Sequence, residues 1–292
     1  MTRAIGLVLA LAGCDAALDQ RLAILDQPRV LAVIAEPAEA QPGQAVTYAV
    51  VVGGPDGAIE GGAATPRWAF CAAPKPPTED NAVSTACLDA GNLVPLGAQA
   101  TVTAALPSNG CLQFGPETPP GNFRPRDADP TGGYYQPVRV DVDLPGDPLL
   151  AFGLSRITCH LATAPSNVAF MYDMSYAANH NPTLDPIVVG PVRAHHDVTL
   201  TASWPAAAAE PYVFYDPASQ TLVTRREAMR VSWFATGGAI DVDASAVDER
   251  DPTTSVSTIW HTPDAGTATL WQVLRDSRGG IAVQRAQVDV AP

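Results

Sequence analysis

Prolines and glycines are spread along the whole chain, and they constrain its fold more than any other feature. The 292 residues include 28 prolines and 23 glycines, which together occupy about one position in six. A proline inside a helix removes a hydrogen bond and clashes with the preceding turn, so long helices are disfavoured at this density. Hydrophobic residues nevertheless make up 47% of the chain. We therefore expect a mainly β protein of short strands joined by loops.

The charge balance excludes one class of partner. The chain has 17 lysine and arginine residues against 30 aspartates and glutamates, for a net charge of −13. Nucleic-acid binding requires clustered basic side chains that neutralise phosphates. We therefore expect no nucleic acid as a partner.

The first residues have the pattern of an export signal. Arg3 precedes an apolar run, Ala4–Leu11, which is shorter than the roughly 20 residues that a membrane-spanning helix needs. The run ends in Leu11-Ala12-Gly13-Cys14, which resembles the lipobox of bacterial lipoproteins. The resemblance implies a signal peptide over residues 1–13 and acylation of Cys14, which would anchor the chain in a membrane. The alternative is an ordinary buried N-terminal helix.

Export also suggests a location. We expect residues 14–27 to form a lipidated N-terminus and tether, with the folded body in the cell envelope. Asp15 follows the proposed lipid site, and in enteric bacteria an aspartate there favours the inner membrane. That rule does not hold in all phyla, so the membrane stays open, with the outer membrane preferred.

Four further cysteines fit an exported protein. Cys71, Cys87, Cys111 and Cys159 are an even number, which predicts two disulfides with three possible connectivities. Cys71–Cys87 is favoured because it closes a proline-rich segment, and this leaves Cys111–Cys159. Zinc is the competing use, but the spacing contains no C-x-x-C or H-x-x-x-H pattern.

Strand patterns occur twice along the chain in the same order. A Val-Thr pair recurs at Val46 and Val198, and a tryptophan within an apolar run recurs at Trp68 and Trp233. This recurrence predicts two copies of one module with both tryptophans in the cores. The strand signals lie at 29–35, 45–52, 66–71, two short runs in 93–106, 137–144, 194–204, 231–236, 258–263, 266–274 and 281–290.

The later part of the chain resembles bacterial immunoglobulin-like and PKD-like domains. The resemblance rests on W-F-A-T-G-G (233–238), W-H-T-P (260–263) and G-T-A-T-L-W-Q-V-L-R-D-S-R-G-G (266–280). The first module shares only P-G-Q-A-V-T (42–47) and its tryptophan strand. The resemblance implies two immunoglobulin-like β-sandwich modules, residues 28–146 and 178–292, and it implies no activity.

A short helical segment is expected between the modules, at residues 147–177. Pro148 suits the first turn of a helix, and apolar residues at Leu150, Leu154, Ile157 and Leu161 recur with helical spacing. We therefore predict a helix over Leu149–Leu161, although Gly153 and Thr158 weaken it.

Long loops are the expected places for a binding surface, because binding residues concentrate in loops held by a rigid scaffold. The two longest are Pro107–Gln136 and Ala239–Ser257. The first is braced by Cys111 and contains the aromatic and arginine residues that are enriched in protein contacts. We predict a contact surface formed by Phe123, Arg124, Arg126, Tyr134 and Tyr135.

Carboxylates in the second loop suggest a possible calcium site. Oxygen ligands at this spacing suit Ca²⁺, although a solvated acidic loop explains the same residues. His261, like His160 and His180, is isolated in the sequence. The candidate metal ligands are Asp241, Asp243, Asp248 and Asp251.

Taken together, the patterns favour a non-catalytic, lipid-anchored envelope protein that presents immunoglobulin-like modules to an envelope protein or polysaccharide. The alternative is a calcium-dependent adhesion or carbohydrate-binding lipoprotein. An enzyme is the third possibility, but no G-x-S-x-G, H-E-x-x-H, S-x-x-K or P-loop motif occurs. We therefore expect no catalytic residue.

Overall fold

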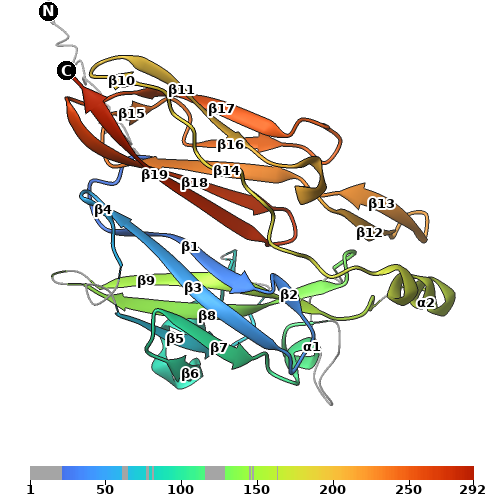
Figure 1. Cartoon of the computed structure of the whole chain (residues 1–292). Helices are drawn as coiled ribbons and strands as arrows, with labels where there is room; N and C mark the ends of the chain where they lie inside the picture. The colour runs from blue at the N-terminus through green and yellow to red at the C-terminus, as the bar shows by residue number, and fades with distance from the viewer. Residues whose placement is uncertain are drawn as a thin grey trace, which may run out of the picture.

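Two β-sandwiches make up the body of the protein (Figure 1). The computed structural model describes residues 22–60, 65–76, 79, 80, 82–115, 129–144, 146, 148–162 and 164–292. The expected mainly β architecture of two immunoglobulin-like modules is confirmed. The signal peptide and Cys14 lie outside the described residues.

The first sandwich packs a sheet of four strands against a sheet of five. The four-stranded sheet contains β1 (Arg29–Glu36), β3 (Ala45–Gly54), β4 (Gly57–Ala58) and β7 (Thr101–Ala105). The five-stranded sheet has the order β2 (Glu39–Ala40), β9 (Leu149–Thr158), β8 (Gly133–Asp143), β5 (Thr65–Cys71) and β6 (Leu93–Gly97). The helical turns η2 (Thr85–Leu88), η3 (Ala90–Asn92) and α1 (Gly110–Gln113) lie in its connections.

The second sandwich is built in the same way. Its larger sheet has the order β10 (Val192–Arg193), β19 (Ile281–Ala291), β18 (Gly266–Asp276), β14 (Met229–Ala235) and β16 (Ala244–Val247). Its smaller sheet has the order β11 (Asp197–Ser203), β17 (Ser255–His261) and β15 (Ala239–Ile240).

The internal repeat expected from the sequence is confirmed by strand order. In each larger sheet a two-residue strand pairs in parallel with the last strand, β2 with β9 and β10 with β19. A hairpin of the last two strands follows, and then the strand that carries the tryptophan. Trp68 on β5 and Trp233 on β14 thus hold equivalent positions, and both are buried.

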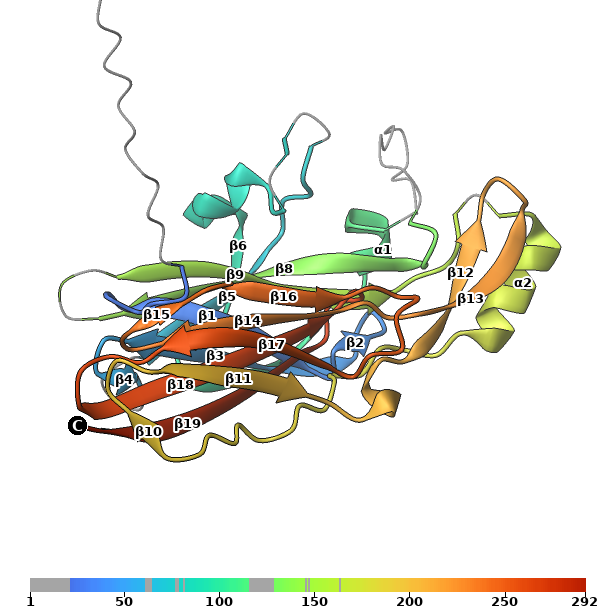
Figure 2. The same cartoon turned by 90° about the horizontal axis from the view of Figure 1, so that it is seen from above.

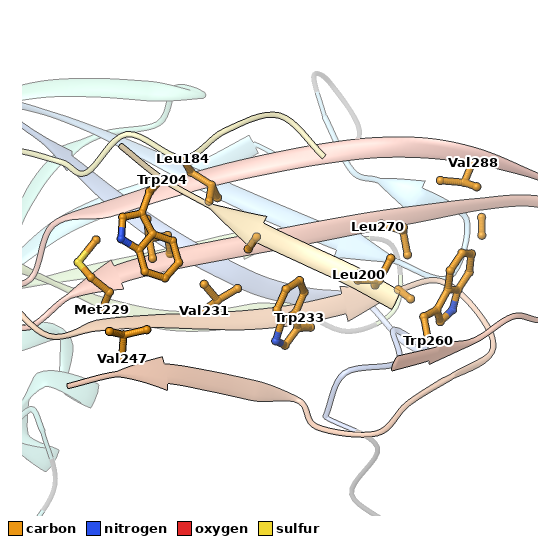
Figure 3. Packing of buried hydrophobic residues seen from close by; sticks show 14 of the residues in the cluster. Leu184, Leu200, Trp204, Met229, Val231, Trp233, Val247, Trp260, Leu270 and Val288 are labelled. Atoms are coloured by element: carbon orange, nitrogen blue, oxygen red, sulfur yellow. The ribbon is translucent and has the colours of Figure 1, made fainter. Parts of the chain in front are cut away.

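Each sandwich has its own apolar core. The second core gathers three tryptophans, Trp204, Trp233 and Trp260, between the two sheets (Figure 3). In the first core Tyr48 packs its ring against the edge of Phe70 and also lies near Trp68. Alternating side chains from facing sheets fill these cores, as expected for strands with one buried face.

The predicted helix over Leu149–Leu161 is wrong. Residues 149–158 form β9, which pairs with β8 along its whole length. Leu150 and Leu154, expected on a buried helix face, are exposed. The alternating strand β8 offers a complete set of backbone partners, and this tertiary pairing outweighs the helical spacing. Because β9 belongs to the first sandwich, that module extends beyond residue 146.

The helix between the modules lies further along the chain. It is α2 (Ser166–Ser175), at the end of the molecule opposite the C-terminus (Figure 1). It packs against a hairpin of β12 (Pro211–Asp216) and β13 (Thr221–Arg226), through contacts that include Tyr172 and Tyr215. Figure 2 shows this hairpin projecting beyond the sandwich. The short helical turn η4 (Ala206–Ala208) precedes it.

Two expected loop regions contain regular structure. The segment Ala239–Ser257 carries β15 and β16 and the start of β17. The described end of the predicted tether is also structured: Leu25 N donates to Ala235 O at 2.9 Å, and Ala235 N donates to Ala23 O at 2.8 Å. Ala23 and Leu25 are buried. Residues 22–25 therefore belong to the folded body.

The modules meet through the outer faces of two sheets. Leu31 and Ala32 of β1 form one apolar cluster with Trp271 and Val273 of β18, and Leu25 completes it. Arg275 Nη2 also donates to Leu31 O at 2.8 Å. Burial of these side chains between the sheets opposes separation of the modules.

Candidate functional site

The predicted contact surface does not form at its two described residues. Tyr134 and Tyr135 lie on β8 rather than in a loop. Tyr134 is buried and its hydroxyl accepts from Asp129 N at 3.0 Å, while the Tyr135 hydroxyl donates to Arg278 O across the junction at 3.2 Å. The prediction is therefore wrong for the buried Tyr134, whereas Tyr135 is half-buried and its hydroxyl is used within the chain. Phe123, Arg124 and Arg126 lie outside the described residues.

The structure does not assemble the four candidate calcium ligands. Asp248 and Asp251 accept backbone N–H groups within their own turns, from Arg250 and Thr253. The backbone carbonyl of Asp243 accepts from Trp233 N. Across the described ranges, no three His, Cys, Asp or Glu side chains form a group that could hold a metal ion. The calcium prediction for this loop is not supported by its geometry.

Asp241 instead pairs with a histidine that is isolated in the sequence. His261 Nε2 lies 2.6 Å from Asp241 Oδ1, and its Nδ1 lies 2.7 Å from Asp197 Oδ1. The strands β15, β17 and β11 place these residues beside one another. Hydrogen bonds to Asp241 and then to Asp197 raise the pKa of His261. With both nitrogens facing carboxylates, the protonated ring is favoured and no lone pair is left for a metal.

Both predicted disulfides are confirmed. Cys71–Cys87 has a Cα–Cα distance of 5.4 Å, and Cys111–Cys159 has one of 5.7 Å. The first bond joins β5 to η2, and the second joins α1 to the residue after β9. Both brace the first sandwich, and the second has no disulfide among its described residues.

The most extensive polar site is a buried charge cluster between the modules. In its first half Arg156 Nε lies 3.0 Å from Glu39 Oε2, and both side chains are almost completely buried. The Glu39 carboxylate also accepts from Thr158 Oγ1 and from the Tyr176 hydroxyl. Arg156 Nη1 donates to the Tyr135 hydroxyl at 3.1 Å.

The second half is centred on Arg278, in the turn between β18 and β19. Its Nε lies 2.7 Å from Glu227 Oε1, and its Nη2 lies 2.9 Å from Glu210 Oε2. Its Nη1 donates to Ala177 O in the segment between the modules. The side chains of Arg278 and Glu227 are buried, whereas Glu210 is partly exposed.

Asn179 connects the two halves. Its backbone N donates to Glu39 Oε2 at 2.9 Å, and its Nδ2 lies 3.2 Å from Asp276 Oδ1. The same Asp276 oxygen accepts from Arg278 N at 2.8 Å and from Gly280 N at 2.9 Å. The first sandwich, the connecting segment and the second sandwich thus share one network. We call these residues the junction cluster: Glu39, Tyr135, Arg156, Tyr176, Asn179, Glu210, Glu227, Asp276 and Arg278.

Burial raises the pKa values of two carboxyl groups in the junction cluster, which contains more carboxylates than guanidinium groups. Burial, reinforced by the negative charge of Asp276, raises the pKa of Glu227 to about 7. Burial also raises the pKa of Asp276. Removal from water disfavours the charged form of a carboxyl group, and a second carboxylate nearby adds to this effect.

The geometry of the cluster suits a structural role. Four of its charged groups, Glu39, Arg156, Glu227 and Arg278, are almost completely buried and already paired. A buried ion pair resists removal of one partner, because the other charge is then left uncompensated. Each ion pair lies within one module, and the bonds of Asn179 and of the Tyr135 hydroxyl connect the two pairs across the junction.

An exposed apolar surface occurs at the end of the molecule that carries α2. Phe170, Met171 and Met174 are 63%, 54% and 71% exposed. Methionine and phenylalanine are enriched in protein interfaces, where the flexible thioether adapts to different partners. Nothing in the sequence analysis singled out this surface, because the helix was expected elsewhere.

The junction cluster was not expected from the sequence either. A usable signal exists at Arg156, which stands within a strand between Ser155 and Ile157. A charged residue in the middle of a buried strand requires a partner. The partner could not be named from the sequence, since Glu39 lies 117 positions away.

Comparisons with known proteins give only distant likenesses. No family model and no curated protein matches the chain. Among solved structures, the fibronectin(III)-like modules of CbhA from Clostridium thermocellum share 9% identity with a TM-score of 0.25, covering 91% of this chain and 94% of that one. The D0-D1 domain of Intimin shares 11% identity with a TM-score of 0.24, covering 90% of this chain and 99% of that one.

A third likeness is to the adhesin InvE of Yersinia pseudotuberculosis, with 10% identity and a TM-score of 0.22, covering 89% of this chain and 58% of that one. Scores of this size do not place the chain in a family. In the part of the chain that the structure describes, no helix is both long enough and apolar enough to cross a membrane.

Proposed function

We propose that the protein is a non-catalytic lipoprotein of the cell envelope that holds two immunoglobulin-like modules in one fixed arrangement close to a membrane. The observation that carries the proposal is the junction. A freely jointed pair of modules needs no buried polar contacts between them. Here the buried Asn179 bonds to Glu39 in one module and to Asp276 in the other. The Tyr135 hydroxyl also donates to Arg278 O across the junction. Such a junction suits a rigid support for binding.

The position of the N-terminal segment gives this support an orientation. Cys14, the proposed lipid site, precedes Leu22 by eight residues, so the body stands at most about 30 Å from the anchor. Residues 23–25 pair with Ala235 at the end of β14, while β12 and β13 lie beyond the start of that strand. Anchoring at Cys14 therefore directs α2 and the hairpin away from the membrane.

The exposed surface of α2 is then presented to other envelope components. It fits a protein better than a lipid surface, because α2 contains no lysine or arginine to attract anionic head groups. The outer membrane is our preferred location. Crosslinking from Phe170 in the native host would identify the partner.

The anchoring part of the proposal is tested by Cys14→Ala in the native host. We expect the parent chain in the membrane fraction with a diacylglycerol mass on its N-terminal peptide, and the variant in the soluble fraction without it. Val188→Ala, at an exposed position far from the lipobox in the sequence, is the control and should stay membrane-bound. Retention of Cys14→Ala in the membrane would contradict the proposal.

A further inference from the structure

An apolar slot of about 560 Å³ lies between the two modules. It adjoins the apolar cluster that Leu25, Leu31 and Ala32 form with Trp271 and Val273. Its walls are the outer face of β1, β3 and β4 in the first module and the facing side of β18 and β19 in the second. Pockets of this size and apolar character occur preferentially at domain interfaces. The side chains that face one another across it are Ile34, Val51, Ala58, Trp271, Ile281 and Val283.

The side chains that line the slot are less buried than those of the neighbouring apolar cluster. Leu25, Leu31 and Val273 are buried between the same sheets, whereas Ile34, Val51, Ala58, Ile281 and Val283 are only half-buried. Apolar groups left half-exposed at an interface gain free energy when a further apolar group covers them. The two sheet faces therefore offer a surface for an apolar ligand.

The walls favour a hydrocarbon over a peptide. The inner strands use their backbone groups for pairing, β3 with β1, β4 and β7, and β18 with β14 and β19. On the edge strand β1, Leu31 O and Ala35 O already accept from Arg275 and Asn181. A peptide in the slot would leave its own N–H and C=O groups without partners, at a cost in free energy. An acyl chain has no such groups.

One end of the slot carries two donors side by side. Trp271 and Arg285 are direct cross-strand partners on β18 and β19, so their side chains share one face. The indole N–H of Trp271 is buried and has no acceptor within the described part of the chain. The guanidinium of Arg285 is exposed and pairs with Glu60, which is itself exposed.

The other end of the slot is acidic. There Asn181 Nδ2 donates to Glu36 Oε2 at 2.7 Å, and a second carboxylate beside Glu36 would be repelled. A ligand carboxylate is therefore better placed beside Arg285, where it can exchange with Glu60 and supply the acceptor that the Trp271 N–H lacks.

We propose that this slot binds a single acyl chain with its carboxylate or ester head beside Arg285 and Trp271. The shared chemistry is that of a fatty acyl group, which a free fatty acid or a membrane lipid can supply. Binding at this site does not depend on the lipid anchor at Cys14.

The test uses the full exported chain carrying Cys14→Ala, with dodecanoate as the probe at concentrations below its micelle range. We expect saturable binding by calorimetry and a change in tryptophan fluorescence that disappears in Trp271→Phe. The other four tryptophans lie in the two module cores, so they serve as a constant background.

Transfer of a fluorescent phospholipid from phosphatidylglycerol vesicles would identify membrane lipid as the source, and binding of dodecanoate alone would identify the free acid.

Two variants fill the slot from opposite walls. Val51→Phe and Val283→Phe should each weaken dodecanoate binding about tenfold or more, since a buried phenylalanine ring occupies the space. Val188→Phe, at an exposed position outside the slot, should bind as the parent does. Arg285→Gln should weaken dodecanoate about fivefold, the size of an exposed ion pair, and leave dodecanol unchanged.

The proposal is overturned if dodecanoate and the vesicle lipid both fail to bind. It is also overturned if both filled variants keep their thermal midpoints and bind as well as the parent, because the acyl chain would then lie elsewhere.

Discussion

Gly133 shows how closely the junction cluster is packed. A Cβ atom at this position would lie 1.9 Å from Arg156 Cζ. Gly133→Ala should therefore displace the guanidinium from Glu39 and lower the free energy of unfolding by about 3 kcal/mol or more, through overpacking and a broken buried pair. Urea unfolding measures this loss. Gly190→Ala meets no atom within 4 Å and is the matched control, and equal stability of the two variants would contradict the packing argument.

Glu227 should make stability depend on pH. Its pKa is raised to about 7 in the folded protein, from 4.5 for the free group, so the folded state binds the proton more tightly. Its contribution to stability is then fully present below pH 4.5 and is lost as the pH rises through 7. Asp276 and His261, whose pKa values are also raised, act in the same direction.

The thermal midpoint should therefore increase as the pH falls from 8 to 6. Glu227→Gln, which cannot titrate, should reduce this increase. His261→Gln should reduce it separately, because it removes the imidazole that bonds to Asp241 and Asp197. An unchanged pH profile in Glu227→Gln would show that the buried carboxyl keeps an ordinary pKa.

Among the structural elements, the two disulfides should differ in what they contribute. Cys71–Cys87 closes a separation of 16 residues and Cys111–Cys159 one of 48. Loop-closure entropy predicts stabilisation of about 3 and about 4 kcal/mol, respectively. Paired alanine variants, one pair for each bond, should show this order in urea unfolding. The reverse order would mean that packing around the bonds, rather than chain entropy, dominates.

On the scale of the whole molecule, the modules should unfold as one unit. Leu25 is buried between them beside Leu31 and Trp271, and loss of such a leucine side chain costs about 2–5 kcal/mol. Leu25→Ala should therefore split a single calorimetric transition into two and increase the radius of gyration measured by X-ray scattering. Val188→Ala, at an exposed position, should change neither. A parent chain that already shows two transitions would contradict a rigid junction.

Local patterns were sufficient for much of the architecture. Alternating apolar residues correctly predicted strands such as β3, β14 and β19, and the spacing of Trp68 and Trp233 predicted two related modules with tryptophan cores. Side chains alternate across a strand wherever one face is buried, so this information is present in short stretches of sequence. The cysteine count in an exported chain likewise predicted the two disulfides.

Contacts between distant residues could not be derived in this way. The segment 149–158 is a strand because β8 lies beside it, although its leucines have helical spacing. Glu39 and Arg156 are 117 positions apart, and Tyr135 proved to be a junction residue only because β18 and β19 turn beside it. Periodicity reports which face of an element is apolar, whereas partners for a buried charge depend on how complete modules pack, and that packing is a property of the folded chain alone.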